Sequence, residues 1–139
     1  MAQIQAEFQE GNRIVFTSRG RSFVNVRELR DDGLIGFSSG ELLLIALGNC
    51  SLGTLMNHQF FYRIPLTKVT ASLHSNGETN PNRISKINID IQLEIDEQSL
   101  ETREGTLKWI GDNCPIGNTL RFTPEMEVRV NLKSDGKSQ

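Results

Sequence analysis

The stretch from residue 41 to residue 62 constrains the fold most, because it contains no proline and its composition favours one helix. Pro65 prevents that helix from continuing far. Its first half, LLLIAL at residues 42–47, is apolar on every side, which is typical of a helix in the interior of a protein. Ser38 or Ser39 could cap its amino end. We therefore expect a long buried helix at the centre of the fold.

Alternation of apolar and polar residues predicts antiparallel strands before and after this helix. The alternation is strict over residues 87–95, where every second residue is Ile or Leu, as in a strand with one buried face. Residues 4–23 contain apolar runs separated by turns, which predicts a hairpin. The expected strand regions are residues 4–23, 67–77, 84–95 and 125–132.

A second helix is expected over residues 96–113. The apolar residues expected on its inner face are Leu100, Leu107 and either Trp109 or Ile110. The helix should stop before Cys114 and Pro115, because a residue that precedes proline avoids the α region. A short helical turn over residues 115–120 would follow. This order of strands and helices predicts an α+β fold, and residues 1–139 read as one domain.

The composition excludes several classes of protein. With a net charge of −2, the chain lacks the basic surface that nonspecific nucleic-acid binding requires. Its longest apolar run, residues 42–47, is far shorter than the roughly 20 residues that cross a bilayer, so no membrane span is expected. The first residues have neither the basic start nor the apolar stretch of a signal peptide, so we expect a cytoplasmic protein. Hydrophobic residues make up only 37% of the chain, so a partner subunit could complete part of the core.

The chain has two cysteines, too few for a disulfide scaffold, so any cysteine chemistry depends on this one pair. Cys114 stands before Pro115, at the cap of the expected turn, where the positive end of a helix dipole stabilises a thiolate. The other interpretation is an unreactive buried cysteine beside a structural proline. Cys50 lies among small residues that leave room for a substrate, although a cysteine in an apolar helix more often behaves as a small hydrophobic residue. The sequence does not show whether the two thiols touch.

Other polar residues give weaker signals. His58 and His74 could join the cysteines at a zinc site, but no ligand spacing of the CxxC or HxxxH kind is present, so we expect neither a metal nor another cofactor. Glu41 lies at the start of the long helix, where a carboxylate is favourable near the positive end of the helix dipole. Nine residues separate it from Cys50, which places the two on roughly opposite sides of an ideal helix.

Two segments resemble the cysteine motifs of the OsmC/Ohr family of thiol-dependent hydroperoxide reductases. They are GELLLIALGNCSLGTL at residues 40–55 and NCPIGNTL at residues 113–120. The alternating strand and the charged helix between them follow the order of the family as well. The resemblance implies an α+β homodimer whose subunits intertwine, with antiparallel sheets around the long cysteine helices and active sites at the subunit interface.

The resemblance also implies roles for particular residues. Cys50 would be the peroxidatic thiol, which attacks a peroxide and becomes a sulfenic acid, and Cys114 would resolve that acid to a disulfide. Glu41 would complete the catalytic set, from the helix cap or across the dimer. The family's best-known members hold the thiolate with an arginine from the amino-terminal strands, and the candidates here are Arg13, Arg19 and Arg21.

The function implied by the resemblance is that of a cytoplasmic, cofactor-free peroxide reductase. It would prefer organic hydroperoxides, with hydrogen peroxide as a second substrate to test, and an external dithiol, in some members a lipoylated protein, would recycle it. Gly40 stands where the family commonly has proline, and Gly117 stands where other members often have a larger polar residue. These differences favour a general OsmC-like branch over the dedicated organic-hydroperoxide branch. The alternative is a non-catalytic OsmC-like protein that binds an apolar ligand or senses redox state.

Overall fold

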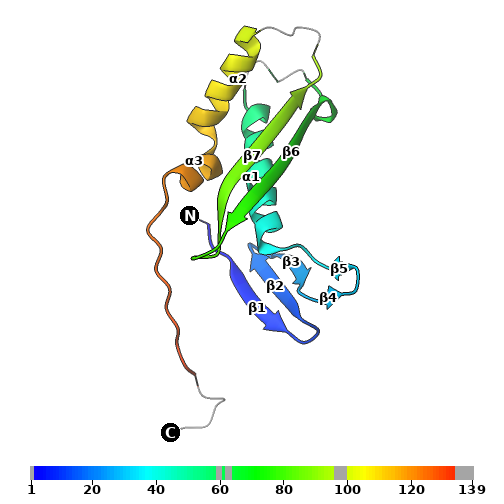
Figure 1. Cartoon of the computed structure of the whole chain (residues 1–139), viewed down its shortest axis with the longest axis vertical. Coiled ribbons are helices and arrows are strands. Elements are labelled where there is room, and N and C mark those ends of the chain that lie inside the picture. Colours follow the sequence, from blue (N-terminus) through cyan, green and yellow to red (C-terminus); the bar gives the residue numbers. More distant parts are fainter. Residues whose placement is uncertain (1, 59–60, 62–63, 96–99, 134–139) are drawn as a thin grey trace.

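The computed structural model of the chain describes residues 2–58, 61, 64–95 and 100–133, arranged as Figure 1 shows. The amino-terminal residues form an antiparallel sheet in the order β1-β2-β3. Its strands are β1 (Gln5–Gln9), β2 (Arg13–Ser18) and β3 (Arg21–Val26). Gly11 and Gly20 lie in the two turns with φ angles of 81° and 74°, which glycine adopts at little cost. The predicted hairpin is confirmed, and β3 extends it to three strands.

A short ribbon of β4 (Leu29–Arg30) and β5 (Gly33–Leu34) leads to helix α1 (Ser39–Met56). The helix begins with a capping box: the Glu41 amide donates to Ser38 Oγ at 3.1 Å, and the Ser38 amide donates to Glu41 Oε1 at 2.8 Å. The long helix and its Ser38 cap are thus confirmed. The helix ends at Met56, earlier than the predicted residue 62, because Asn57 closes it as the C-cap. Residues 59–60 and 62 of the predicted helix lie outside the described part of the chain.

A long antiparallel hairpin follows, formed by β6 (Val69–Glu78) and β7 (Arg83–Leu93) after the short 3-10 helix η2 (Leu66–Lys68). Leu73 pairs with Ile89 in this register. The predicted alternation is confirmed, since Ile89 and Ile91 are half-buried while Asp90 between them is exposed. One face of the hairpin therefore lies against the rest of the fold.

The second helix, α2 (Leu100–Asn113), is confirmed over its described residues, and α3 (Pro115–Arg121) follows directly. Trp109 and Ile110 of α2 pack against the core, as expected. The inward placement of Leu107 is wrong, because 62% of its surface is exposed. The helix turns Thr106 inward instead, with its hydroxyl bonded to the Thr102 carbonyl at 2.8 Å. Residues 96–99 and the side chain of Leu100 lie outside the described part.

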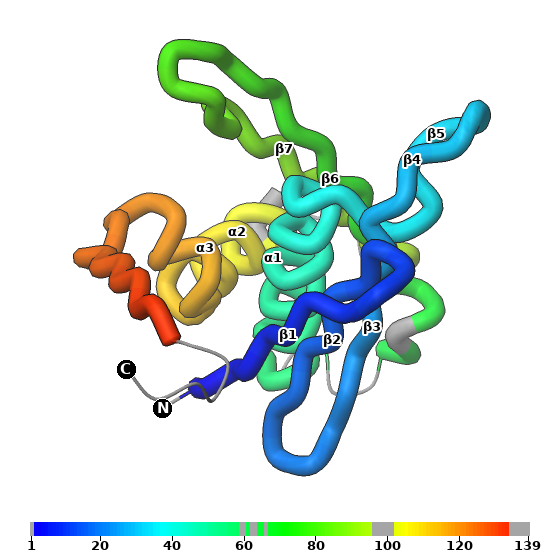
Figure 2. The backbone as a smooth tube through the Cα atoms, turned by 90° about the horizontal axis from the view of Figure 1, so that it is seen from below, coloured from blue at the N-terminus to red at the C-terminus, as the bar shows by residue number. Residues whose placement is uncertain are grey.

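The core lies where the carboxyl half of α1 meets the hairpin and α2. Leu55, Phe61 and Val69 are buried there, and partly buried residues pack around them. Gly48 permits the close contact on the hairpin side, since a Cβ at this position would lie 3.1 Å from Leu73 Cδ1. Figure 2 shows α1 between the β6–β7 hairpin and the pair of helices α2 and α3.

Helix α1 is central in position but is not buried on every side, so that expectation is wrong for the single chain. Only 28% of the helix is buried, and Ile45 and Met56 are each about half exposed, at 49% and 50%. The hairpin, α2 and α3 together cover one part of the helix surface and leave the rest open. By length and composition α1 could cross a membrane, which the short run at residues 42–47 did not suggest, but core helices of water-soluble proteins pass the same test.

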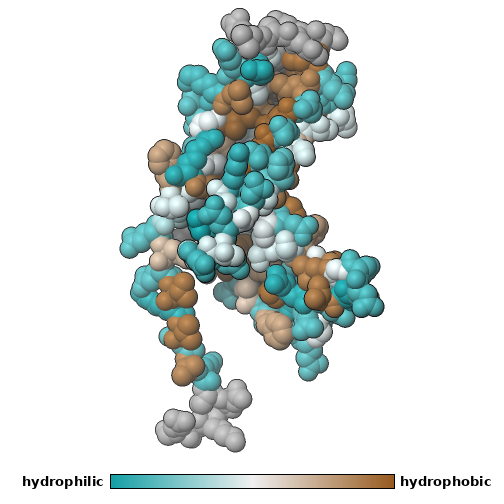
Figure 3. Space-filling model, in the orientation of Figure 1, coloured by the Kyte–Doolittle hydropathy of each residue, from teal (hydrophilic) through white to brown (hydrophobic). Residues whose placement is uncertain are grey.

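The predicted final strand at residues 125–132 is wrong. Residues 122–133 extend away from the body of the fold without a strand partner, as Figure 1 shows, and we call this segment the carboxyl arm. Its apolar residues, brown in Figure 3, are exposed. They are Phe122, Met126, Val128, Val130 and Leu132. The alternation indicates a segment suited to pairing, but none of the strands in the described part of the chain pairs with it.

Candidate thiol site

The fold brings the two cysteines into contact. Cys50 lies on helix α1, and Cys114 lies at the junction of α2 and α3. Their Sγ atoms are 3.3 Å apart, although 64 residues separate them in the sequence. A disulfide bond is about 2.05 Å long, so both groups are free thiols. The two residues singled out by their motifs therefore form one site.

Cys114 is the buried member of the pair, with 1% of its surface exposed. It is the N-cap of α3, as predicted, and Pro115 occupies the first turn. Burial opposes ionisation of this thiol, but the Gly117 amide, the Cys50 thiol and the hydroxyls of Ser51 and Thr54 outweigh it, so the pKa of Cys114 is lowered. The polar contacts of this sulfur thus favour the thiolate.

Cys50 is partly exposed and has a different electrostatic environment. Burial raises the pKa of Cys50, and the neighbouring Cys114 raises it further, while the Ile116 amide and Thr54 act in the opposite direction. The Ile116 amide donates to Cys50 Sγ at 3.5 Å. In the reduced pair, Cys114 therefore ionises first and Cys50 keeps the proton.

Glu41 lies apart from the thiols within one chain. Its nine-residue separation from Cys50 corresponds to about 13 Å along α1. The carboxylate is fully exposed, and hydrogen bonds from the Ser38 amide and then the Ser38 hydroxyl lower its pKa. The structure thus gives Glu41 a helix-capping contact and keeps it distant from both sulfurs of its own chain.

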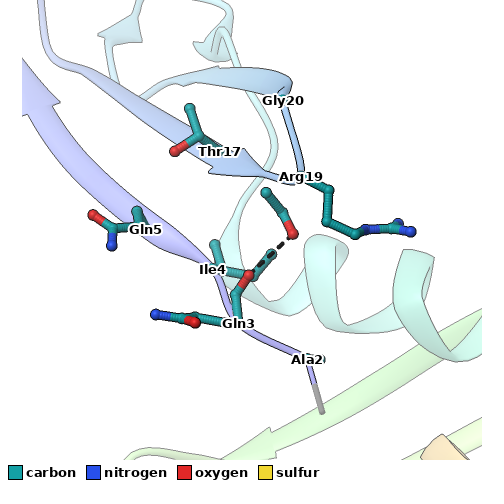
Figure 4. A pocket seen from close by; sticks show the side chains of 8 residues that line it. Ala2, Gln3, Ile4, Gln5, Thr17, Arg19 and Gly20 are labelled. Atoms are coloured by element: carbon teal, nitrogen blue, oxygen red, sulfur yellow. Dashed lines mark hydrogen bonds between the residues drawn. The ribbon is translucent and has the colours of Figure 1, made fainter.

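The three candidate arginines lie on the amino-terminal sheet, and among the described residues no arginine hydrogen-bonds either sulfur. Arg13 Nε donates to the Glu10 carbonyl at 3.1 Å. Arg19 lies in the β2–β3 turn at the rim of a surface hollow that Ile4 and Thr17 also line, and Figure 4 shows its side chain extending away from both. The structure of one chain therefore does not select among Arg13, Arg19 and Arg21.

The two histidines lie away from the thiols and from each other. The ring of His58 packs against Trp109 at 4.7 Å, and His74 on β6 lies 3.4 Å from the Asn88 amide. Across the described ranges, no three side chains of His, Cys, Asp or Glu gather where a metal ion could bind.

An apolar groove runs beside the thiol site, between α1, β7 and α3. Its apolar lining consists of Leu43, Leu47, Ile84, Ile87, Ile89 and Leu120. Gly117 also lines it, and a Cβ at that position would lie 3.4 Å from Cys114 Sγ. Because glycine has no side chain, Gly117 places only its backbone between the groove and the Cys114 sulfur, and Leu47 Cδ1 lies on the same side.

Sequence reasoning missed the polar neighbours of the sulfurs. Ser51 Oγ lies 3.8 Å from Cys114 Sγ, and the hydroxyl of Thr54 lies near both thiols. A signal was present, because Asn49, Ser51 and Thr54 are polar residues in the middle of a helix whose first half is apolar. Their partner could not be identified without knowing that residue 114 folds back onto α1.

Residues 30–129 match the family model of OsmC-like proteins. No curated protein matches the chain.

Solved structures share the fold at low sequence identity. An OsmC-like protein from Mycoplasma pneumoniae is 20% identical, with a TM-score of 0.70 and 87% of each chain covered. A protein from Psychrobacter arcticus, named as a candidate osmotic stress induced and detoxification response protein, is 18% identical, with a TM-score of 0.67, covering 86% of this chain and 88% of that one. A hypothetical protein from Aquifex aeolicus is 14% identical, with a TM-score of 0.66, covering 88% and 89%. These similarities show that the chain has the mixed α+β fold, with antiparallel sheets, of the OsmC-like structures. Because the family model also matches most of its length, the chain belongs to the family of OsmC-like proteins.

Proposed function

We propose that the protein is a thiol-dependent peroxide reductase in which Cys50 is the peroxidatic thiol and Cys114 the resolving thiol. The observation that carries the proposal is the 3.3 Å contact between one partly exposed and one buried sulfur. The exposed thiol can meet a peroxide from solvent. The buried one can only react with its neighbour, which is the task of a resolving thiol.

The proposed reaction starts with one proton shared by the pair. Cys114 as the thiolate takes the proton of Cys50, and the Cys50 thiolate attacks the O–O bond of ROOH, forming Cys50–SOH and RO⁻. The proton passes from Cys114 to RO⁻, which leaves as ROH. The Cys114 thiolate then attacks the sulfenic sulfur, forming the disulfide and releasing hydroxide. An external dithiol, in some relatives of this type a lipoylated protein, restores both thiols by exchange.

Support for an organic substrate comes from the groove. Its leucine and isoleucine lining and its contact with the Gly117 side of the thiol site suit an apolar hydroperoxide better than hydrogen peroxide. We therefore propose organic hydroperoxides as the preferred substrates, with hydrogen peroxide as the comparison to measure.

We also propose that the protein acts as an intertwined homodimer in the cytoplasm. The open surface of α1 and the exposed apolar residues of the carboxyl arm support a second copy as their partner. A dimer is also the arrangement in which Glu41 could act on Cys50, because about 13 Å of helix separates them in one chain.

Peroxide consumption by the purified protein with a dithiol tests the proposed function. We expect turnover of cumene hydroperoxide that Cys50→Ser abolishes. Cys114→Ser should instead accumulate oxidised Cys50, visible as added oxygen by mass spectrometry. If the wild type consumes neither cumene hydroperoxide nor hydrogen peroxide, the proposal is wrong, and if both variants keep full activity, the assigned roles are wrong.

A second candidate function is a non-catalytic OsmC-like protein that binds an apolar ligand or senses redox state. The raised pKa of Cys50 favours it, because a thiol that keeps its proton is a slower nucleophile. In that case the protein should retain a ligand through purification and should not consume peroxide.

A further inference from the structure

We propose that Ser51 is a positioning residue for the resolving thiol: its hydroxyl, 3.8 Å from Cys114 Sγ, holds Cys114 in the ionised form that attacks the sulfenic acid of Cys50. This inference rests on the proposed function. It adds a residue that neither cysteine motif identifies.

The first argument is the burial of the Ser51 hydroxyl. Ser51 has 0% of its surface exposed, and Cys114 Sγ is the hydrogen-bonding partner of its Oγ among the described residues. Burying a hydroxyl without a partner costs free energy, and such groups are rare in folded proteins. The Cys114 sulfur therefore supplies the hydrogen-bonding partner that the buried Ser51 hydroxyl needs.

The second argument is the arrangement of the two groups on α1. Cys50 and Ser51 are consecutive, so their side chains point about 100° apart on the helix. One sulfur can touch both only by lying between them, and Cys114 does so, at 3.3 Å from Cys50 Sγ and 3.8 Å from Ser51 Oγ. The Ser51 hydroxyl is thus held beside the Cys114 sulfur, which must react. Cys50 Sγ, the atom that Cys114 attacks, lies on the other side of the Cys114 sulfur.

The third argument is the set of groups that face Cys114 from each packed element. Within the described part of the chain, Cys50 is the titratable group that acts on it, and it comes from α1. The remaining groups are not ionisable: the hydroxyls of Ser51 and Thr54 on α1 and the Gly117 amide on α3. Thr54 Oγ1 also lies 3.5 Å from the Asn113 carbonyl, which competes for its proton. Ser51 is therefore the side-chain donor committed to this sulfur.

The step that Ser51 would assist is the second half of the reaction. The Cys114 thiolate attacks the sulfur of Cys50–SOH, an S–S bond forms, the S–O bond breaks, and hydroxide leaves with the electron pair. The Cys114 sulfur is oxidised and the Cys50 sulfur is reduced by the same amount. A protonated Cys114 would be slow in this step, because the thiolate is the nucleophile.

The direct test is the ionisation of Cys114 in the absence of peroxide. In a Cys50→Ala background, Cys114 is the only cysteine, and its thiolate can be titrated by ultraviolet absorbance. We expect Ser51→Ala to raise the pKa of Cys114 by about one unit, since a hydrogen bond to a charged group has about that effect. Ser51→Thr keeps a hydroxyl and should restore the original pKa.

The matched control is Thr106→Val, which removes another buried hydroxyl that bonds a backbone carbonyl and no sulfur. It should leave the pKa of Cys114 unchanged. If Ser51→Ala shifts the titration no more than Thr106→Val does, the inference is wrong. If Ser51→Ala does not fold, the variants Ser51→Thr and Ser51→Val have nearly the same shape and differ in the hydroxyl, and the same comparison applies between them.

A second measurement follows the chemistry with both cysteines present. At neutral pH, Ser51→Ala should form the disulfide up to about tenfold more slowly after one equivalent of hydroperoxide. With excess hydroperoxide, more Cys50 should reach the sulfinic acid, read by mass spectrometry. An unchanged rate of disulfide formation would count against Ser51. A wild type inert to peroxide would instead refute the proposed function. The titration of Cys114 would in that case still show whether Ser51 stabilises its thiolate.

Discussion

Among single residues, Glu41 has a contact whose effect depends on pH. Hydrogen bonds from Ser38 lower its pKa in the folded protein, so the ionised carboxylate stabilises the fold above its ordinary pKa. This stabilisation is lost as the pH falls through the lowered pKa of the folded state. Glu41→Gln should therefore lower the unfolding temperature at neutral pH, and the difference from the wild type should shrink in acid.

Thermal unfolding by circular dichroism over a series of pH values measures this effect. Glu104→Gln, which removes an exposed carboxylate from α2, is the control for a general change in charge. A Glu41→Gln difference that is constant with pH would contradict the capping role. Because Glu41 is far from the sulfurs of its own chain, the thiolate titration should not move.

The sequence predicted those features of the site that depend on neighbouring residues in the chain. Cys114 before Pro115 was predicted as a helix cap because proline restricts its neighbour, and the structure confirms it. The contact between Cys50 and Cys114 came only from the family resemblance, because 64 residues of chain separate them. Ser51 was missed for the same reason: its partner is set by tertiary packing, which no local pattern encodes.

At the level of elements, Asn25 ties β3 to the segment that enters α1. Its side chain donates to the Phe37 carbonyl at 2.9 Å and accepts from the Phe37 amide at 2.9 Å, and 3% of the residue is exposed. Asn25→Ala should lower the free energy of unfolding by about 1–3 kcal/mol, because the Phe37 groups lose their partners. Urea denaturation measures this, with the exposed Asn76→Ala as control. Equal stability of the two variants would contradict the predicted tie.

The elements show where sequence patterns succeed and where they fail. The alternation of β7 predicted a strand correctly because β6 follows the same pattern and lies within reach as its partner. The carboxyl arm alternates equally well, but no strand among the residues that the structure describes pairs with it. Alternation indicates which face of a segment needs covering, whereas pairing depends on which edge is near. The predicted inward placement of Leu107 was wrong for a similar reason, since α2 turns a face with Thr106 toward the core and leaves Leu107 exposed.

At the level of the whole molecule, the carboxyl arm offers a test of the proposed dimer. Val128 and Val130 are 76% and 83% exposed in one chain, so replacing both with serine should change a monomer's stability by less than about 0.5 kcal/mol for each residue. In a dimer that covers the arm, the same double variant should weaken association. We expect a lower dimer fraction by sedimentation velocity.

The control for this experiment replaces Glu127 and Arg129 with serine. These residues alternate with the valines and form an ion pair with each other at 2.9 Å. Replacing them should have little effect on association, because an exposed ion pair contributes little free energy. A wild type that sediments as a monomer would refute the dimer. Equal effects of the two double variants would show that the valine face is not the contact.

The spacing of the two thiols along the chain also affects how the molecule unfolds. A disulfide between residues 50 and 114 would enclose β6, β7 and α2 in one covalent loop. Closing a loop of that size restricts the unfolded chain and would stabilise the folded one by about 4 kcal/mol on the chain-entropy account. In the proposed cycle, each turnover would then alternate between a disulfide-linked chain and a reduced chain that unfolds more easily. Under the proposed function, a cell exposed to peroxide would hold this protein in its more heat-resistant form for as long as reductant is scarce.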